Sequence, residues 1–166
     1  MGTWEELEAE EPARAARIEK ARESALEALV AAWPPHPIEP SGPAWADESG
    51  GNAFRDGVRG KTWQELPGEL LDYHRSQMSF LGPAEFREVL PAWLAAAMGK
   101  PTDIQEALLY RLTPGRDVDR FRARFEPLTP LQRNAIAQVL DVLRLRWSGA
   151  DEAEIAQLRE TTWSTP

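Results

Sequence analysis

The chain has 166 residues, of which 42% are hydrophobic, and it carries a net charge of −8. This length and apolar fraction are enough for one domain with a hydrophobic core. The negative charge argues against nucleic acid and against an anionic membrane surface, because concentrations of Lys and Arg bind both. The absence of cysteine excludes disulfides, thiolate catalysis and zinc sites built from cysteine.

The N-terminal residues show neither the basic nor the apolar region of a secretory signal. No apolar run approaches the roughly 20 residues that span a bilayer. We therefore expect a cytoplasmic protein that does not enter a membrane. The acidic charge favours solubility and suits a basic protein partner.

Residues 3–33 have the apolar spacing of a helix, with Ile18, Leu29 and Trp33 on one face. Pro12 predicts a break between a short acidic turn and the main helix. Glutamates are concentrated before this proline, where the dipole of a helix N-terminus favours acidic side chains. A solvated helix surface is the ordinary role of such a run, and binding to a partner is the alternative. The glutamates are Glu5, Glu6, Glu8, Glu10 and Glu11.

Residues 34–61 contain five prolines and five glycines and show no periodicity. This composition predicts a long irregular loop. Trp45 and Phe54 are expected to pin the loop onto the core, because burial of an aromatic ring stabilises an otherwise irregular segment.

From residue 62 onward the pattern is helical. Thr62 with Glu65, and Thr129 with Gln132, have the spacing of a helix capping box. Pro91 is expected to kink a helix or to begin a new one. The predicted helices cover residues 63–78, 83–90, 91–98, 103–112, 117–125, 130–147 and 151–161.

No stretch alternates with the period of a strand. The predicted fold class is therefore all-α. We expect a single domain over residues 1–166 with about seven helices, the irregular loop at 34–61 and a frayed tail at 162–166. In the helix at 130–147, Leu131 and Trp147 are expected to face the core.

Catalytic chemistry has little support in the sequence. The two histidines are His36, in the proline-rich loop, and His74. Asp72, His74 and Ser76 have the residue types of a catalytic triad, but a step of two residues turns a helix by about 200° and separates these side chains. Histidine pairs with metal-ligand spacing and glycine-rich phosphate loops are absent from the sequence. We therefore expect no enzyme activity, no metal and no cofactor.

Arginines are concentrated between residues 111 and 124. Ion pairs with the acidic N-terminal helix are the more ordinary role of such a cluster. The alternative is an anion site at Arg116, Arg120 and Arg124, close to His74 or the loop. Guanidinium groups suit this role because they match carboxylate and phosphate oxygens.

The segment from Phe80 to Leu94, FLGPAEFREVLPAWL, resembles a motif of the form FL(T/S)PExFRxYLPAYL. The motif belongs to a bacterial family of small proteins of unknown function, and the resemblance spans roughly residues 26–147. Gly82, Val89 and Trp93 depart from the motif at packing positions. The resemblance supplies no catalytic residues, and it implies a setting among bacterial toxin–immunity and other accessory genes.

The same segment predicts the centre of the core. Phe86, Leu90 and Trp93 fall on one helical face. An apolar residue just before Pro83 can close the start of the helix. The expected central residues are Phe80, Leu81, Phe86, Leu90, Pro91 and Trp93.

We expect a non-enzymatic protein-binding module, most concretely an immunity-type protein that neutralises a cognate toxin or effector with a basic surface. The alternative is an accessory enzyme or small-anion-binding protein that uses Arg116, Arg120, Arg124 and His74. The expected partner-binding patch combines the N-terminal glutamates with the loop and consists of Glu5, Glu6, Glu8, Glu10, Glu11, Trp45, Asp47 and Glu48.

Overall fold

The computed structural model describes residues 4–41, 51–99, 103–147 and 149–164, with side chains from residue 11 onward. Of the described residues, 74% are helical and none forms a strand, which confirms the predicted all-α fold. The elements are α1 (Trp4–Ala32), α2 (Gly51–Val58), the 3₁₀ helix η2 (Trp63–Glu65), α3 (Gly68–Tyr73), α4 (Gln77–Phe80), α5 (Pro83–Ala97), α6 (Asp103–Leu112), α7 (Val118–Phe125), α8 (Pro130–Arg146) and α9 (Ala150–Thr161). Within these residues, none of the helices combines the length and apolar character that crossing a bilayer requires.

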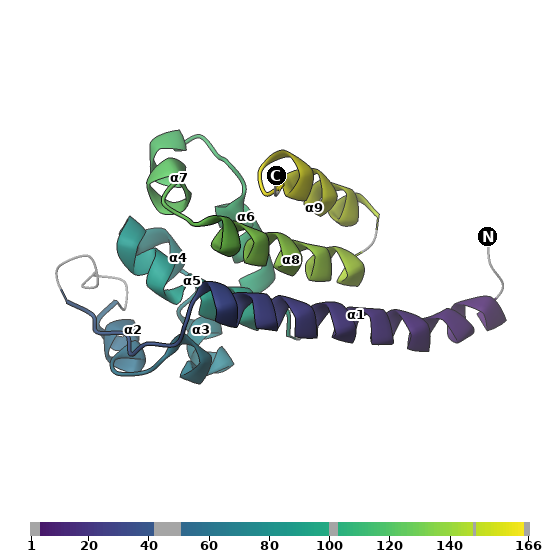
Figure 1. Cartoon of the computed structure of the whole chain (residues 1–166), viewed down its shortest axis with the longest axis horizontal. Helices are drawn as coiled ribbons and strands as arrows, with labels where there is room; N and C mark the ends of the chain where they lie inside the picture. The colour runs from purple at the N-terminus through teal and green to yellow at the C-terminus, as the bar shows by residue number, and fades with distance from the viewer. Residues whose placement is uncertain (1–3, 42–50, 100–102, 148, 165–166) are drawn as a thin grey trace.

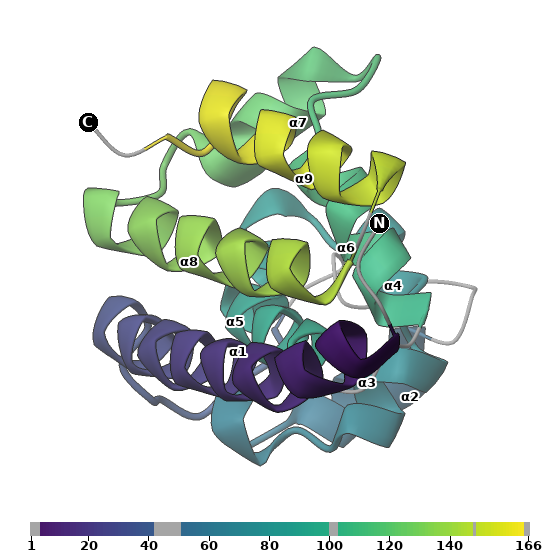
Figure 2. The ribbon, with the colours of Figure 1, turned by 90° about the vertical axis from the view of Figure 1, so that its right-hand side faces the viewer.

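Helix α8 lies between α1 and α9, so these three helices form successive layers (Figures 1 and 2). Helices α1 and α8 run antiparallel. Arg14, in the first half of α1, donates to the carbonyl of Leu145 at 3.0 Å, and Gln132, at the start of α8, donates to the carbonyl of Ala32 at 3.4 Å. Helix α5 passes behind this layer and packs against α6, α7 and α8.

A series of aromatic rings crosses the core. Phe54 of α2 stacks on Trp93 of α5 with 5.8 Å between ring centroids, and Trp93 contacts Phe86 at 6.0 Å. Phe86 meets Phe125 of α7 at 5.7 Å, and Phe125 meets Trp163 at 5.2 Å. All five side chains are buried. The series therefore joins α2, α5, α7 and the C-terminal end of the described chain.

The predicted centre of the core is confirmed except at one residue. Phe80 is 49% exposed, so the prediction that it is central is wrong. Helix α4 ends at Phe80, and the following residue turns its side chain inward instead. The buried members of the predicted set are Leu81, Phe86, Leu90, Pro91 and Trp93.

Two prolines lie inside helices that they were expected to interrupt. Helix α1 continues through Pro12, and α5 continues through Pro91, so the two helices predicted at 83–90 and 91–98 are one. Each proline removes one main-chain hydrogen bond, but its fixed φ is close to the helical value. The packing of α5 against six other elements holds the helix together across Pro91.

The helix predicted at 63–78 is instead three short elements, η2, α3 and α4. Leu66 adopts an extended conformation, with φ −73° and ψ 120°. Steric contact with the ring of Pro67 disfavours the helical region at Leu66, so the helix cannot propagate. The expected interaction of Thr62 with Glu65 is present, because the Thr62 amide donates to the Glu65 carboxylate at 2.7 Å.

The segment predicted as an irregular loop at 34–61 contains a helix, α2. Phe54 is buried as expected, whereas Trp45 lies outside the described residues. Buried Ile38 also anchors the segment. Its amide donates to the Lys61 carbonyl at 2.9 Å, and its carbonyl accepts from Gly60 at 2.8 Å.

The described part of the predicted frayed tail is docked. Trp163 is buried, and its indole N–H donates to the carbonyl of Leu112 at 3.0 Å.

At the start of α8, Thr129 and Gln132 form the predicted capping box. The prediction that Leu131 faces the core is wrong, because this residue lies in the first turn of α8 and is 61% exposed, while Trp147 is partly buried.

Replacing Phe86 should test the importance of the aromatic series. We expect Phe86→Ala to lower the free energy of unfolding by about 3–5 kcal/mol, because it leaves a cavity between Trp93 and Phe125. Phe80→Ala is the matched control and should cost about 1 kcal/mol or less, because this ring is half exposed. Urea denaturation of both variants measures the difference, and equal losses would contradict this account of the core.

Glu88 of α5 should make stability depend on pH. Burial raises the pKa of its carboxyl above the ordinary 4.5, the charge of His36 partly offsets this rise, and Glu85 adds to it. The folded state therefore holds this proton more tightly than the unfolded chain, and the associated stability is lost as the pH rises above 4.5 through the raised pKa.

We expect Glu88→Gln to unfold at higher urea than the wild type at pH 7. This difference in urea midpoint should narrow toward pH 4, because the carboxyl is then largely protonated in both states. A difference in urea midpoint that is constant with pH, or that widens as the pH falls, would contradict the predicted direction of the pKa shift.

Candidate functional site

The predicted partner patch lies largely outside the part of the chain for which side chains are described. Trp45, Asp47 and Glu48 are outside the described residues. Glu5, Glu6, Glu8 and Glu10 belong to α1, with side chains outside the described set. Glu11 is exposed. The N-terminal end of α1 extends beyond the end of α8 (Figure 1). The patch as a whole therefore stays a prediction.

Three arginines from two helices converge on the end of α4. Arg111 of α6 donates to the Ser79 hydroxyl, and Arg120 of α7 donates to the Ser79 carbonyl. Arg124 donates to the Leu81 carbonyl at 3.0 Å. The expectation that these arginines pair with the acidic N-terminal helix is wrong, because α7 packs on α5, whereas α1 packs on α8.

These guanidinium groups perturb one another. Burial, followed by the positive charges of Arg120 and Arg111, lowers the pKa of Arg124 to about 10. Burial also lowers the pKa of Arg111. Asp117 has the opposite effect on Arg124 but is the smallest of its influences. Arg124 remains charged at neutral pH, so neutral main-chain and hydroxyl oxygens hold together a group of like charges.

The arginines line a hollow of about 400 Å³ between the end of α6, the turn at 113–117 and α7. We call it the arginine hollow. Four arginines contribute to its wall, and Asp117 is the single carboxylate among its described lining residues. The four are Arg111, Arg116, Arg120 and Arg124. The structure thus brings together the three arginines named from the sequence and adds Arg111.

His74 does not belong to the arginine hollow, in contrast to the sequence-based expectation. It follows α3 directly, and its ring contacts Phe54 at 5.6 Å and Tyr73 at 4.8 Å between centroids. Among the side chains described, no group of three or more metal-ligating residues is close enough to hold a metal ion.

A second hollow, which we call the acidic groove, lies between α6 and α9 and has a volume of about 830 Å³. Its apolar lining includes the buried residues Ile155 and Leu158 and the partly buried Leu109 and Trp147. Tyr110 lies at its edge and is 72% exposed. The groove is open to solvent rather than enclosed.

Carboxylates surround this apolar surface. Glu106 of α6 and both Asp151 and Glu154 of α9 line the groove and are exposed. The described lining residues include no lysine, arginine or histidine. The described charged side chains that line this apolar surface are therefore all acidic.

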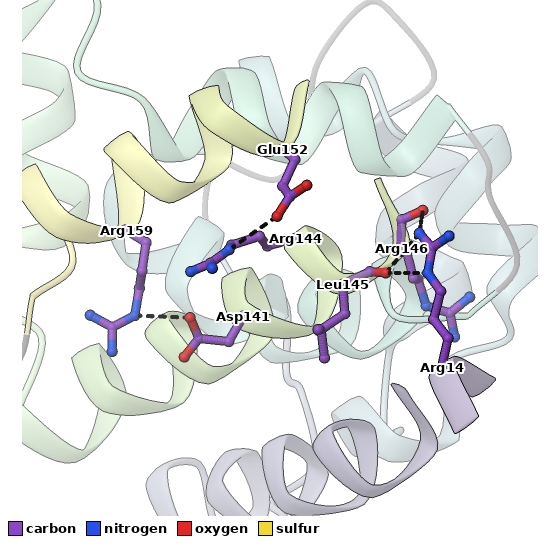
Figure 3. Close-up of polar contacts among 7 residues, drawn as sticks. All are labelled: Arg14, Asp141, Arg144, Leu145, Arg146, Glu152 and Arg159. Atoms are coloured by element: carbon purple, nitrogen blue, oxygen red, sulfur yellow. Dashed lines mark hydrogen bonds and ion pairs between the residues drawn. The ribbon is translucent and has the colours of Figure 1, made fainter. Parts of the chain in front are cut away.

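Polar contacts hold the α9 wall of the groove in place (Figure 3). Arg144 of α8 pairs with Glu152 at 3.6 Å, and Arg159 of α9 pairs with Asp141 of α8 at 3.5 Å. Both pairs join α8 to α9, one near each end of α9.

The acidic groove was not among the sites predicted from the sequence, although the sequence of α6 contains one indication of it. Ile104, Leu108 and Leu112 of α6 occupy one helical face and are buried. Leu109 and Tyr110 are two further large apolar residues that lie away from this face. Such residues mark a second contact surface on a helix, but the partner element α9 is too distant in sequence to be paired by pattern.

Comparison with known families supports the sequence-based expectation of an uncharacterised family. The model of DUF6714, described as a family of unknown function, matches residues 45–162. Searches of curated proteins and of solved structures found no match. The matched region covers well over half of the chain and includes every helix from α2 to α9. The chain therefore belongs to DUF6714, a family of unknown function.

Proposed function

We propose that this protein is a non-enzymatic protein-binding module that holds a basic, amphipathic segment of a partner protein in the acidic groove. The observation that carries the proposal is that the described lining of the groove combines apolar residues with carboxylates and includes no basic residue. An apolar helix face could bury its side chains between α6 and α9 while flanking Lys or Arg side chains meet Glu106, Asp151 and Glu154.

The shape and chemistry of the groove favour a macromolecule over a small ligand. Small-ligand sites enclose most of the ligand and direct several polar groups toward it. The charged groups of the acidic groove lie on exposed parts of α6 and α9, and much of its lining between them is apolar. Exposed Tyr110 adds an aromatic side chain of the type that carries much of the energy at protein interfaces.

The most specific form of the proposal is an immunity-type protein that acts in the cytoplasm on a cognate toxin or effector. Acidic groups around an apolar groove suit a partner with a basic surface, because opposite charges accelerate association and exclude acidic competitors. The N-terminal glutamates would add to the same negative field.

Co-expression with the product of the adjacent gene tests this proposal. We expect the two proteins to co-purify, with affinity that falls as salt is raised because the rim charges are exposed. If the neighbour is toxic, co-expression should protect the cell. Failure of every neighbouring gene product to bind would count against the immunity form of the proposal.

Charge reversal tests the groove itself. Glu154→Lys should weaken binding about 10-fold, mainly through a lower association rate, because it places a positive charge at the groove. Glu160→Lys is the matched control, since it makes the same change at an exposed α9 residue that does not line the groove. Surface plasmon resonance with the co-purified partner should show the loss for Glu154→Lys alone. Equal effects of both variants would place the partner elsewhere.

A further inference from the structure

The arginine hollow contains more positive charge than its structural role requires. Three of its arginines each donate one hydrogen bond to an oxygen near the end of α4. A guanidinium group carries five N–H donors, so these contacts leave most of the donors of Arg111, Arg120 and Arg124 unused. The contacts also fix the position of each group, which lowers the entropy lost when a ligand binds.

Arg124 supplies a buried donor at this hollow. Its side chain is 3% exposed, and its guanidinium lies over the ring of Phe86 at 4.2 Å. Its Nε is buried and has no hydrogen-bond partner among the described residues. A buried, unpaired N–H of a charged group is costly. Because Arg124 lines the hollow, an anion there would lie next to this under-paired guanidinium and stabilise its charge.

Arg116 has no structural partner to explain its position. It lies exposed on the turn between α6 and α7 and lines the hollow. Within the described part of the chain, it forms no hydrogen bond, ion pair or aromatic contact. Its side chain is therefore available to contact a ligand in the hollow from the turn.

The charge balance of the hollow points to the class of ligand. Asp117, the one carboxylate of the described lining, is already engaged, because its Oδ1 accepts from the Arg120 amide at 3.0 Å and caps α7. Four arginines with one such carboxylate produce a local positive field in a chain whose net charge is −8. Clustered guanidinium groups of this kind match the oxygens of phosphate.

We propose that the arginine hollow binds the phosphate group of a small molecule, either inorganic phosphate or a phosphomonoester. Arg124 and Arg120 hold the phosphate oxygens from the anchored side, and Arg116 closes on them from the turn. The hollow, at about 400 Å³, has room for the phosphate and for part of the organic group that is esterified to it. The site lies on α6 and α7 and does not depend on the protein-binding role proposed for the acidic groove.

Titration calorimetry of the full chain with inorganic phosphate and, separately, glycerol 3-phosphate tests this site. We expect saturable binding of at least one of them at constant ionic strength. Tighter binding of glycerol 3-phosphate would show that the esterified organic group contributes to binding. Equal binding of the two would show that the site recognises the phosphate group alone. Absence of saturation by both at about 10 mM would overturn the proposal, because an affinity weaker than that is a general charge effect.

Arg116→Gln is the variant to compare, because this exposed side chain makes no contact on which folding depends. It should weaken binding about 10-fold, which is the loss of one charge-assisted hydrogen bond. Arg122→Gln is the matched control, since Arg122 is an exposed arginine of α7 that does not line the hollow. Equal losses for both variants would show a response to net charge and overturn the proposal.

A second measurement locates the ligand independently of affinity. Phosphate should shift the backbone amide NMR signals of Gly115 and Arg116 in the wild type, while those of α9 stay unchanged. The shifts should be lost in Arg116→Gln and retained in Arg122→Gln. Shifts spread evenly over the exposed arginines of the protein would overturn the proposal.

Discussion

The aromatic series from Phe54 to Trp163 is the interaction on which the rest of this structure depends. Its five residues have the largest fully buried side chains of the core. Their rings connect segments that lie far apart in sequence. Both candidate surfaces follow from it. Phe125 positions α7, so that adjacent Arg124 lies over Phe86 and faces the arginine hollow. Trp163 binds the last carbonyl of α6 and so holds the end of α9 beside that helix, where the two form the acidic groove.

Although the net charge of the chain is −8, two neighbouring surfaces, the arginine hollow and the acidic groove, carry charges of opposite sign. Tyr110 and Thr113 line both the arginine hollow and the acidic groove, so the C-terminal end of α6 is their common wall. The guanidinium of Arg111 lies 4.9 Å from the Tyr110 ring centroid on this wall. Screening by salt shortens the reach of each field to about 10 Å, so ligands of opposite charge would be attracted to different sides of this wall.

Local chemistry accounts for the features of the fold that were predicted well. Thr129 and Gln132 satisfy each other's unpaired amides through contacts within one helical turn, and the periodic apolar face of α8 requires no knowledge of its neighbours. Pro67 also acts locally, through Leu66, but the helix predicted at 63–78 did not take its effect into account and so joined three short elements into one. Helix α2 was missed because its eight residues include two glycines, and its formation depends on the burial of Phe54 and Val58 against the core.

The sequence by itself determined the all-α class, the start of α8, the core positions of Phe86 and Trp93, and the grouping of arginines near residue 120. These properties rest on spacing along one helix or on residue type. Only the tertiary structure decided what the arginines contact, that Phe80 faces outward, that Trp163 is docked, and that α6 and α9 enclose an acidic groove. Each of these depends on contacts between residues that are distant in the chain. A side chain's partner across the fold is selected by how whole helices pack, and that information is absent from any single helical repeat.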